Sequence, residues 1–401
     1  MNSPVEHVKG ELGGVRPRGL PVVHCPVNIS AAYKHSVSYC IGFVVGVRLV
    51  YAVLLYGVLR TKGIFNVPFM GVVKLPFDWL YLFAAWDTGY YYSIAQYWYP
   101  SSLSPQWAFF PLYPAMVKAL NSIGFDVSAG AFMVATIAAL VSIPLLLKVS
   151  RKYLSVDQAF KATLLYFLFP PVFVFSGASY SESVFLLLSL LSWNYHLQGR
   201  EVRAGLAAGL CTLTRSYGIL IALPLAYDFL RRRDFRKLGC LAIPASALAG
   251  WLIYAYSRTG SFAVLSARTF WNSQNSIIFR NGLIELVQGR LNSLPVLLPF
   301  LWKYFPIALA ALISVLLFAL LLLRMWKMDR ALGYYSLASL LVIVYFGFFP
   351  SFGSFPRYLA FIFPIALALS TRRNWLFYGA VTTFLALSFV AWWAFLTDGF
   401  F

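Results

Sequence analysis

The sequence predicts an all-α polytopic membrane protein, and its composition and its pattern of apolar runs are the observations that predict it. Of the 401 residues, 60% are hydrophobic and 11% are charged. Soluble domains carry about 25% charged residues, so a soluble chain with this composition could not cover its surface with polar groups. Apolar runs near or above about 18 residues recur along the chain, as membrane-spanning helices require.

Nine apolar runs are interpreted as spanning helices. No long soluble region separates them, so we expect residues 1–35 to form a cytoplasmic tail and residues 36–401 to form a single transmembrane domain. The tail lacks the apolar core of a signal peptide, and the first span is expected to stay in the mature protein as an anchor. The runs cover residues 36–59, 127–148, 162–177, 183–198, 239–257, 300–323, 331–350, 357–371 and 375–396.

The distribution of basic residues predicts the orientation in the membrane. The chain has 32 Lys and Arg against 13 Asp and Glu, which gives a formal charge of +19. With the N-terminus in the cytoplasm, twice as many basic residues fall in cytoplasmic segments as in the much longer outer segments, in agreement with the positive-inside rule. Because the basic residues punctuate apolar runs, we do not expect a nucleic-acid partner.

Two apolar segments are not expected to form single membrane-spanning helices. Segment 108–122 is apolar but carries two prolines and a lysine, which favours an interfacial helix in the first outer loop, residues 60–126. Segment 204–228 has basic flanks on both sides and is too short to cross twice. A re-entrant pair of half-helices fits it, with Thr214, Arg215 and Ser216 near the tip. A second large outer loop covers residues 258–299.

The strongest candidate for chemistry is Asp87. All four histidines fall on the cytoplasmic side, so a general base at the outer face is expected to be a carboxylate. On a helix, Asp87 shares a face with Tyr90 and Tyr91, whose rings suit sugars. The alternative is an interfacial aromatic belt with an aspartate in it by chance. The six outer carboxylates are Asp78, Asp87, Asp126, Glu182, Glu285 and Asp398.

Three more charged residues are candidates, each with a structural alternative. Glu182 begins a span, where it could bind an acceptor or only complement the helix dipole behind Ser181 as the N-cap. Arg215 lies in apolar sequence, where a phosphate would be its matching ligand. The structural alternative is an internal salt bridge or hydrogen bonds to backbone carbonyls. Arg357, at an outer span boundary, could bind the same phosphate or only snorkel.

Several catalytic and metal-binding patterns are missing from the sequence. The four cysteines show no CxxC spacing, which predicts neither a disulfide framework nor a zinc site. The chain has no DxD, no GxxxxGK[ST] and no HExxH. We therefore predict no metal site and no cofactor.

Several motifs carry a resemblance to a known family. The stretch FAAWDTGYYYSIA at 83–95, followed by FFPLYP at 109–114, resembles the GPI mannosyltransferase 2 family (phosphatidylinositol-glycan class V). The stretches YSESVF at 180–185, TRSYG at 214–218 and PRY at 356–358 are similar to later motifs of that family. The resemblance implies a GT-C fold and inverting transfer of mannose from a polyprenyl (dolichyl) phosphate donor, with an acid in the first outer loop that falls on Asp87.

The resemblance also gives the candidate residues roles. Asp87 would act as the general base at the extracytoplasmic face, and Arg215 and Arg357 would stabilise the leaving phosphate. Trp86, Tyr90, Tyr91 and Glu182 would contact the sugar or the glycolipid or glycan acceptor. The lipid donor is a substrate, so no cofactor is implied. The main alternative is a transporter or lipid flippase, which an intramembrane arginine and a re-entrant segment also fit, although no internal repeat is visible.

The orientation can be tested by cysteine labelling in a background whose native cysteines are replaced by serine. Arg290→Cys should react with a membrane-impermeant reagent added from outside, and Arg233→Cys should react only after the membrane is permeabilised. The reverse pattern would overturn the orientation and with it the outer position of Asp87.

Overall fold

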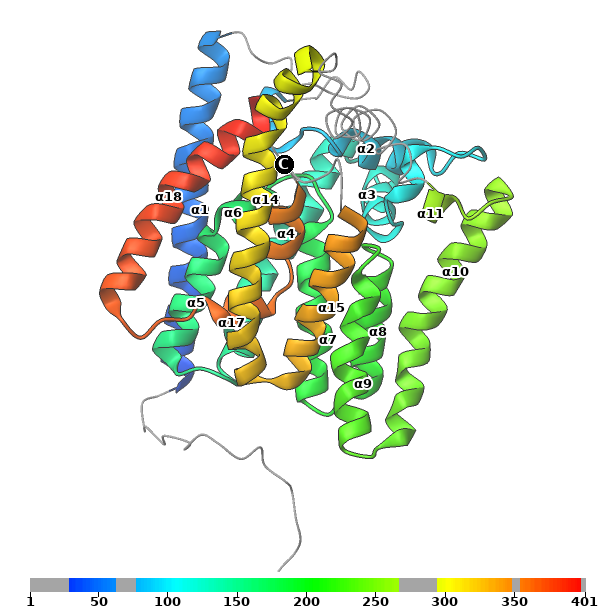
Figure 1. Ribbon diagram of the computed structural model, residues 1–401, viewed down its shortest axis with the longest axis vertical. Coiled ribbons are helices and arrows are strands. Elements are labelled where there is room, and N and C mark those ends of the chain that lie inside the picture. The colour runs from blue at the N-terminus through cyan, green and yellow to red at the C-terminus, as the bar shows by residue number, and fades with distance from the viewer. Residues whose placement is uncertain (1–28, 63–76, 267–293, 348–353, 398–401) are drawn as a thin grey trace, which may run out of the picture.

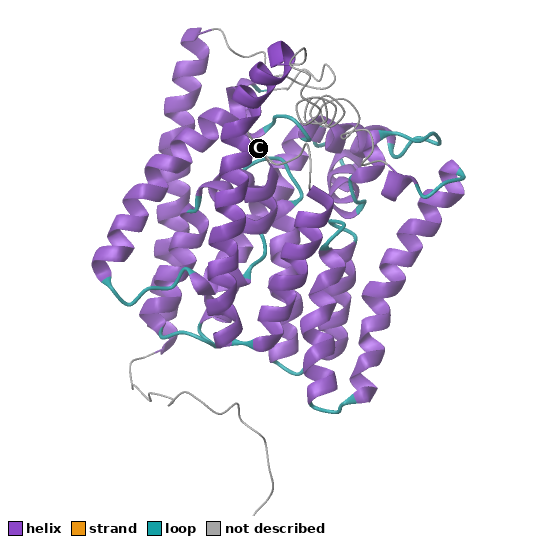
Figure 2. Ribbon diagram, viewed as in Figure 1, coloured by secondary structure: helices purple, strands orange, loops and turns teal. Residues whose placement is uncertain are grey.

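Helices make up all the regular secondary structure in the part of the chain that the structure, a computed structural model, describes: residues 29–62, 77–266, 294–347 and 354–397 (Figure 2). Four helices in these ranges are long and apolar enough to span a membrane, namely Tyr33–Thr61, Val127–Ser150, Phe235–Thr259 and Asn374–Thr397. The predicted all-α membrane class is confirmed.

The predicted apolar runs fall on helices, and prolines break two of them. Run 162–177 divides into α5 (Val156–Leu168) and α6 (Pro170–Phe175), because Pro170 cannot continue the hydrogen-bond ladder of α5. Run 357–371 likewise divides at Pro364. The remaining runs fall on α1 (Ile29–Lys62), α4 (Val127–Ser150), α7 (Glu182–Leu197), α10 (Ala242–Thr259), α14 (Leu294–Met328), α15 (Arg330–Gly347), α16 (Phe355–Ala360), α17 (Pro364–Ala368) and α18 (Asn374–Thr397).

Two predicted boundaries need comment. The first helix begins at Ile29, seven residues before the predicted start at 36, because the polar residues between them include no proline or glycine to stop a helix. Of the second outer loop, the structure describes α11 (Ala263–Ser266), while residues 267–293 lie outside the described residues, as do 348–350 of the run 331–350.

Short helices cover one end of the bundle, which we call the site end. They are η1 (Asp78–Phe83), α2 (Thr88–Tyr97), η2 (Pro105–Ala108) and α3 (Leu112–Ser122) (Figure 1). The interfacial helices predicted in the first outer loop are therefore present. Aromatic packing attaches them to α10: the Tyr99 ring lies 4.8 Å from the Trp251 ring, and the Trp107 ring lies 5.5 Å from it.

The segment predicted to be re-entrant forms a helical hairpin. In Figure 1, α8 (Glu201–Thr212) leads toward the site end and α9 (Ala222–Arg231) returns after η3 (Gly218–Ile221). The tip is tightly packed, since a Cβ added at Gly218 would lie 2.1 Å from the carbonyl oxygen of Cys211. A hydrogen bond of 2.9 Å from the Leu112 N–H to the Leu213 carbonyl joins the tip to α3.

Helix α7 lies in the middle of the bundle between α4 and α8. Most of its residues are buried, including Trp193, and a helix that is apolar on all sides is one surrounded by other helices. Its first residue, Glu182, reaches the site end. The basic turns around residues 150, 200, 231–237, 328 and 372 gather at the opposite end (Figure 1).

Candidate active site

The turn before α2 places Asp87 at the start of the helix without using its side chain as a cap. Trp86 has a φ of 53°, in the left-handed region that bulky residues rarely adopt. Its indole N–H donates to the Phe395 carbonyl of α18 at 2.9 Å, which anchors the turn. Asp87 occupies the N-cap position of α2, yet its side chain makes no capping hydrogen bond. The carboxylate is therefore available for contacts away from its own helix.

The structure brings the four charged candidates into one ion-pair network. Arg357 Nη2 lies 3.0 Å from Asp87 Oδ2, and Arg357 Nε lies 3.2 Å from Glu182 Oε1. Arg215 Nη1 lies 2.6 Å from the same oxygen of Glu182. The four residues come from the turn before α2, the start of α7, the hairpin tip and α16. The network thus contains two carboxylates and two guanidinium groups, which balance in charge.

The four side chains differ in their access to solvent. Glu182 has an exposed fraction of 0%, Arg357 of 4% and Arg215 of 10%. Asp87 is the most accessible of the four, at 23%. Asp87 is therefore the carboxylate of the network that an incoming hydroxyl group can reach, while Glu182 lies behind the arginines.

Glu182 is more than a complement to the helix dipole. Ser181 occupies the N-cap position of α7, as the alternative supposed, but its side chain makes no capping hydrogen bond. Ser181 Oγ instead accepts from Arg215 Nη1 at 3.1 Å and lies 2.7 Å from the Tyr91 hydroxyl. Burial raises the pKa of the Tyr91 phenol, so this hydroxyl keeps its proton and holds Ser181 in place.

The contact between Glu182 and the arginines is one of charge rather than of directed hydrogen bonds. Neither oxygen of Glu182 accepts a hydrogen bond from the described residues, although Oε1 is within ion-pair distance of both guanidinium groups. Buried polar atoms in native proteins almost always have a hydrogen-bond partner. Oε2 thus leaves acceptor capacity in the site that the described part of the protein does not use.

Aromatic rings surround both guanidinium groups. The Arg357 Cζ lies 4.8 Å from the Tyr358 ring, and the Arg215 Cζ lies 5.1 Å from the same ring. Tyr180 and Tyr217 add further cation–π contacts at 5.4 and 5.2 Å. The sequence alone did not indicate a role for these three tyrosines. Their positions next to Ser181, Ser216 and Arg357 within the motifs were the signal that could have identified them.

The three aromatic residues expected to bind sugar lie at different depths. Tyr91 is buried, and its ring packs edge-on against Phe109 and Tyr113 at 5.0 and 4.9 Å, so it supports the site from behind. Tyr90 and Trp86 are half-buried, and the Tyr90 ring stacks on Phe109 at 4.9 Å.

Among the described residues, no group of three or more His, Cys, Asp or Glu side chains is arranged to hold a metal ion.

The chain matches a known family over the segment that carries most of this site. Residues 71–241 match the family model described as Mannosyltransferase (PIG-V), which confirms the resemblance predicted from the motifs. Asp87, Glu182 and Arg215 lie inside the matched segment, and Arg357 lies after it. No curated protein matches the chain.

The chain is also similar to solved structures of two proteins. ArnT from Cupriavidus metallidurans in the apo state is 15% identical, with a TM-score of 0.43 and coverage of 79% of this chain and 58% of that one. The Archaeoglobus fulgidus oligosaccharyltransferase, in complex with Zn and sulfate, is 16% identical, with a TM-score of 0.40 and coverage of 88% and 52%. ArnT bound to undecaprenyl phosphate has a TM-score of 0.40 and 15% identity, with coverage of 87% and 60%. The chain thus spans between half and three fifths of the length of these proteins.

Glu182→Gln tests whether the buried carboxylate holds the site together. The variant keeps the size of the side chain but leaves two buried guanidinium groups with one carboxylate. Removal of one partner from a buried ion pair typically costs about 3–5 kcal/mol of unfolding free energy. The midpoint of thermal unfolding in detergent should fall by several degrees, whereas Asp78→Asn at an exposed position should leave it unchanged. Equal midpoints for Glu182→Gln and the wild type would contradict this role.

Proposed function

We propose that the protein transfers a hexose, most simply mannose, from a polyprenyl (dolichyl) phosphate sugar to a lipid-linked or glycan acceptor, with inversion at the anomeric carbon. The observation that carries the proposal is the ion-pair network at the site end, in which solvent-accessible Asp87 pairs with buried Arg357, and Glu182 joins Arg357 to Arg215. The family match supports the sugar, and the apolar helices support a lipid-borne donor. The protein is an integral membrane protein, and we propose that its site faces away from the cytoplasm.

In the proposed reaction, Asp87 acts as the general base. It takes the proton of an acceptor hydroxyl as that oxygen forms its bond to the anomeric carbon, and the bond from this carbon to the phosphate oxygen breaks. Arg357 contacts Oδ2 of Asp87, and no described contact engages Oδ1. The ion pair thus orients the carboxylate while leaving one oxygen free for the hydroxyl.

The charge balance of the network suits a phosphate leaving group. The polyprenyl phosphate gains negative charge as it departs, and guanidinium groups are well matched to phosphate oxygens. When Asp87 takes up the proton it becomes neutral, so Arg357 loses one of its anionic partners at the step in which the phosphate gains charge. Arg215, at the tip of the hairpin, supplies the second positive charge.

The remaining candidates have supporting roles in this proposal. Trp86 and Tyr90 are half-buried and can offer ring surface to a sugar. Glu182 is fully buried behind the arginines, so in this proposal it holds Arg215 and Arg357 in place rather than contacting the sugar. Tyr91 acts through Ser181 on Arg215 rather than by direct contact with the sugar. Neither a metal ion nor an organic cofactor takes part in these steps.

Asp87→Asn tests the base directly, because it keeps size and hydrogen-bonding shape but cannot accept the proton. General-base catalysis contributes about 10²–10⁴-fold, so the initial rate of sugar transfer per folded enzyme should fall by that order while donor binding persists. Labelled polyprenyl phosphate mannose with candidate acceptors gives the rate. Asp78→Asn, nine residues earlier in the chain, is the control and should transfer at close to the wild-type rate. Near-normal transfer by Asp87→Asn would falsify the assignment.

Arg215→Ala tests the donor phosphate site. Loss of a charge-assisted contact should weaken the binding of the donor lipid by roughly tenfold or more, in line with about 1.5–3 kcal/mol for a hydrogen bond to a charged group. Binding is measured by titration of the detergent-solubilised enzyme with donor, and circular dichroism checks that the fold persists. A variant that binds donor as tightly as the wild type would show that Arg215 serves only to neutralise Glu182.

A further inference from the structure

The turn between α9 and α10 concentrates positive charge at the end of the bundle opposite to the site (Figure 1). It includes η4 (Phe235–Leu241), which leads into α10. Within seven positions the turn carries five basic residues, which the structure divides into two groups. They are Arg231, Arg232, Arg233, Arg236 and Lys237.

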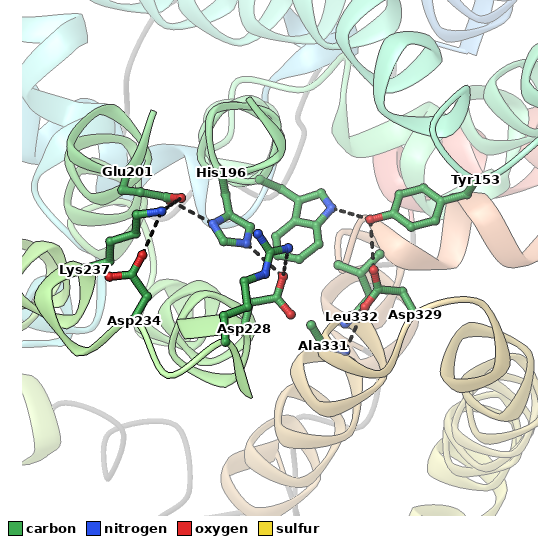
Figure 3. Close-up of polar contacts among 11 residues, drawn as sticks. Tyr153, His196, Glu201, Asp228, Asp234, Lys237, Asp329, Ala331 and Leu332 are labelled. Carbon is green, nitrogen blue, oxygen red and sulfur yellow. Dashed lines mark hydrogen bonds and ion pairs between the residues drawn. The ribbon is translucent and has the colours of Figure 1, made fainter. Parts of the chain in front are cut away.

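Two of the five are held by a polar network at the base of the helical hairpin (Figure 3). Arg232 lies 3.3 Å from Asp228, and Lys237 lies 3.0 Å from Asp234 and 3.8 Å from Glu201. His196 of α7 joins the two helices of the hairpin, with Nδ1 2.8 Å from Glu201 and Nε2 3.0 Å from Asp228. These contacts satisfy the charges of Arg232 and Lys237 within the protein.

The other three arginines, Arg231, Arg233 and Arg236, are exposed. No hydrogen bond or ion pair joins their side chains to any residue in the described ranges. Arg233 has a φ of 55°, in the left-handed conformation that glycine usually occupies after a helix. A residue with a side chain is strained in this conformation. The presence of an arginine here therefore suggests a function for its side chain.

The segment next to these arginines packs against the core through the half-buried residues Leu238, Cys240 and Leu241, and it leaves Phe235 exposed. None of the residues of η4 is buried, and Phe235 is 63% exposed between Arg233 and Arg236. Aromatic side chains flanked by basic residues are typical of segments that lie at the level of lipid headgroups. The turn therefore offers three unpaired guanidinium groups and one apolar ring to whatever lies beside it.

We propose that this turn is a binding site for an anionic phospholipid, with Arg231, Arg233 and Arg236 on the headgroup phosphate and Phe235 in the adjoining interface. Charge complementarity selects this occupant, since arginine matches phosphate oxygens and a bilayer supplies them at this height. The proposal does not depend on the proposed transfer reaction.

The test is a titration of the full-length protein in detergent with phosphatidylglycerol, followed by native mass spectrometry. The wild type should bind phosphatidylglycerol in preference to phosphatidylcholine of the same chain length. A basic residue near an anionic surface contributes about fivefold, so Arg231→Gln, Arg233→Gln and Arg236→Gln combined should weaken binding by roughly 100-fold. Because the three side chains are exposed, the thermal unfolding midpoint should stay unchanged.

A charge-matched control separates a built site from the general attraction of a basic surface. Arg200 and Arg372 in turns, and Arg203 in the first turn of α8, are also exposed at this end of the bundle. Their combined change to glutamine removes the same charge. This control should bind phosphatidylglycerol within about threefold of the wild type. The fivefold contribution to affinity applies to each arginine that contacts the bound headgroup, and these three arginines do not contact it. An equal loss in both triple variants overturns the proposal. So does displacement of the lipid by millimolar inorganic phosphate, which would identify a site for the free anion instead.

Discussion

The site depends on one buried carboxylate that is shared by two arginines. Glu182 is fully buried, and its Oε1 atom meets both Arg215 and Arg357. Without this carboxylate, two guanidinium groups would face each other in apolar surroundings, which is costly in free energy. The shared oxygen therefore allows two positive charges to be held close to Asp87 within a membrane protein.

This arrangement links local backbone features to the overall packing of the helices. The left-handed turn at Trp86 releases Asp87 from capping α2, and the tight tip at Gly218 brings Arg215 level with the start of α7. Helix α16, 270 residues after Asp87, brings Arg357 to the same point. No two of the four charged residues are neighbours in sequence, so the ion pairs form only when the bundle is packed.

Much of the fold could be predicted from the sequence because the signals were local. The long apolar runs and the basic residues on both sides of the hairpin are properties of short stretches. The predicted helices and the two-helix form of segment 204–228 are present, whereas the orientation in the membrane stays a prediction. Each charged site residue could likewise be selected by its own chemistry. Their pairing could not be predicted, because it depends on which helices lie side by side. Ser181 shows the same limit: it occupies the N-cap position, but its hydroxyl accepts from Arg215 of another segment instead of capping the helix.

The network at the opposite end shows the same limit. The sequence placed His196, Glu201 and Asp228 on the cytoplasmic side but indicated no role for them. They lie on three different helices, and contacts between helices leave no periodic pattern in the sequence. His196 nevertheless bonds to one carboxylate from each helix of the hairpin (Figure 3). Next to this network, the Tyr153 hydroxyl donates to Asp329 between α14 and α15 at 3.1 Å, and burial raises the pKa of the Asp329 carboxyl.

Helix α7 carries an ion-pairing residue near each of its ends, which constrains its length. Glu182 binds the tip of the hairpin, and His196 binds its base fourteen positions later, about 21 Å along the axis at 1.5 Å per residue. One inserted residue would rotate everything after it by about 100° and move it by about 1.5 Å, so both contacts could not be kept. The spacing between Glu182 and His196 is therefore expected to be the least variable distance in homologous chains, even where the apolar residues between them change freely.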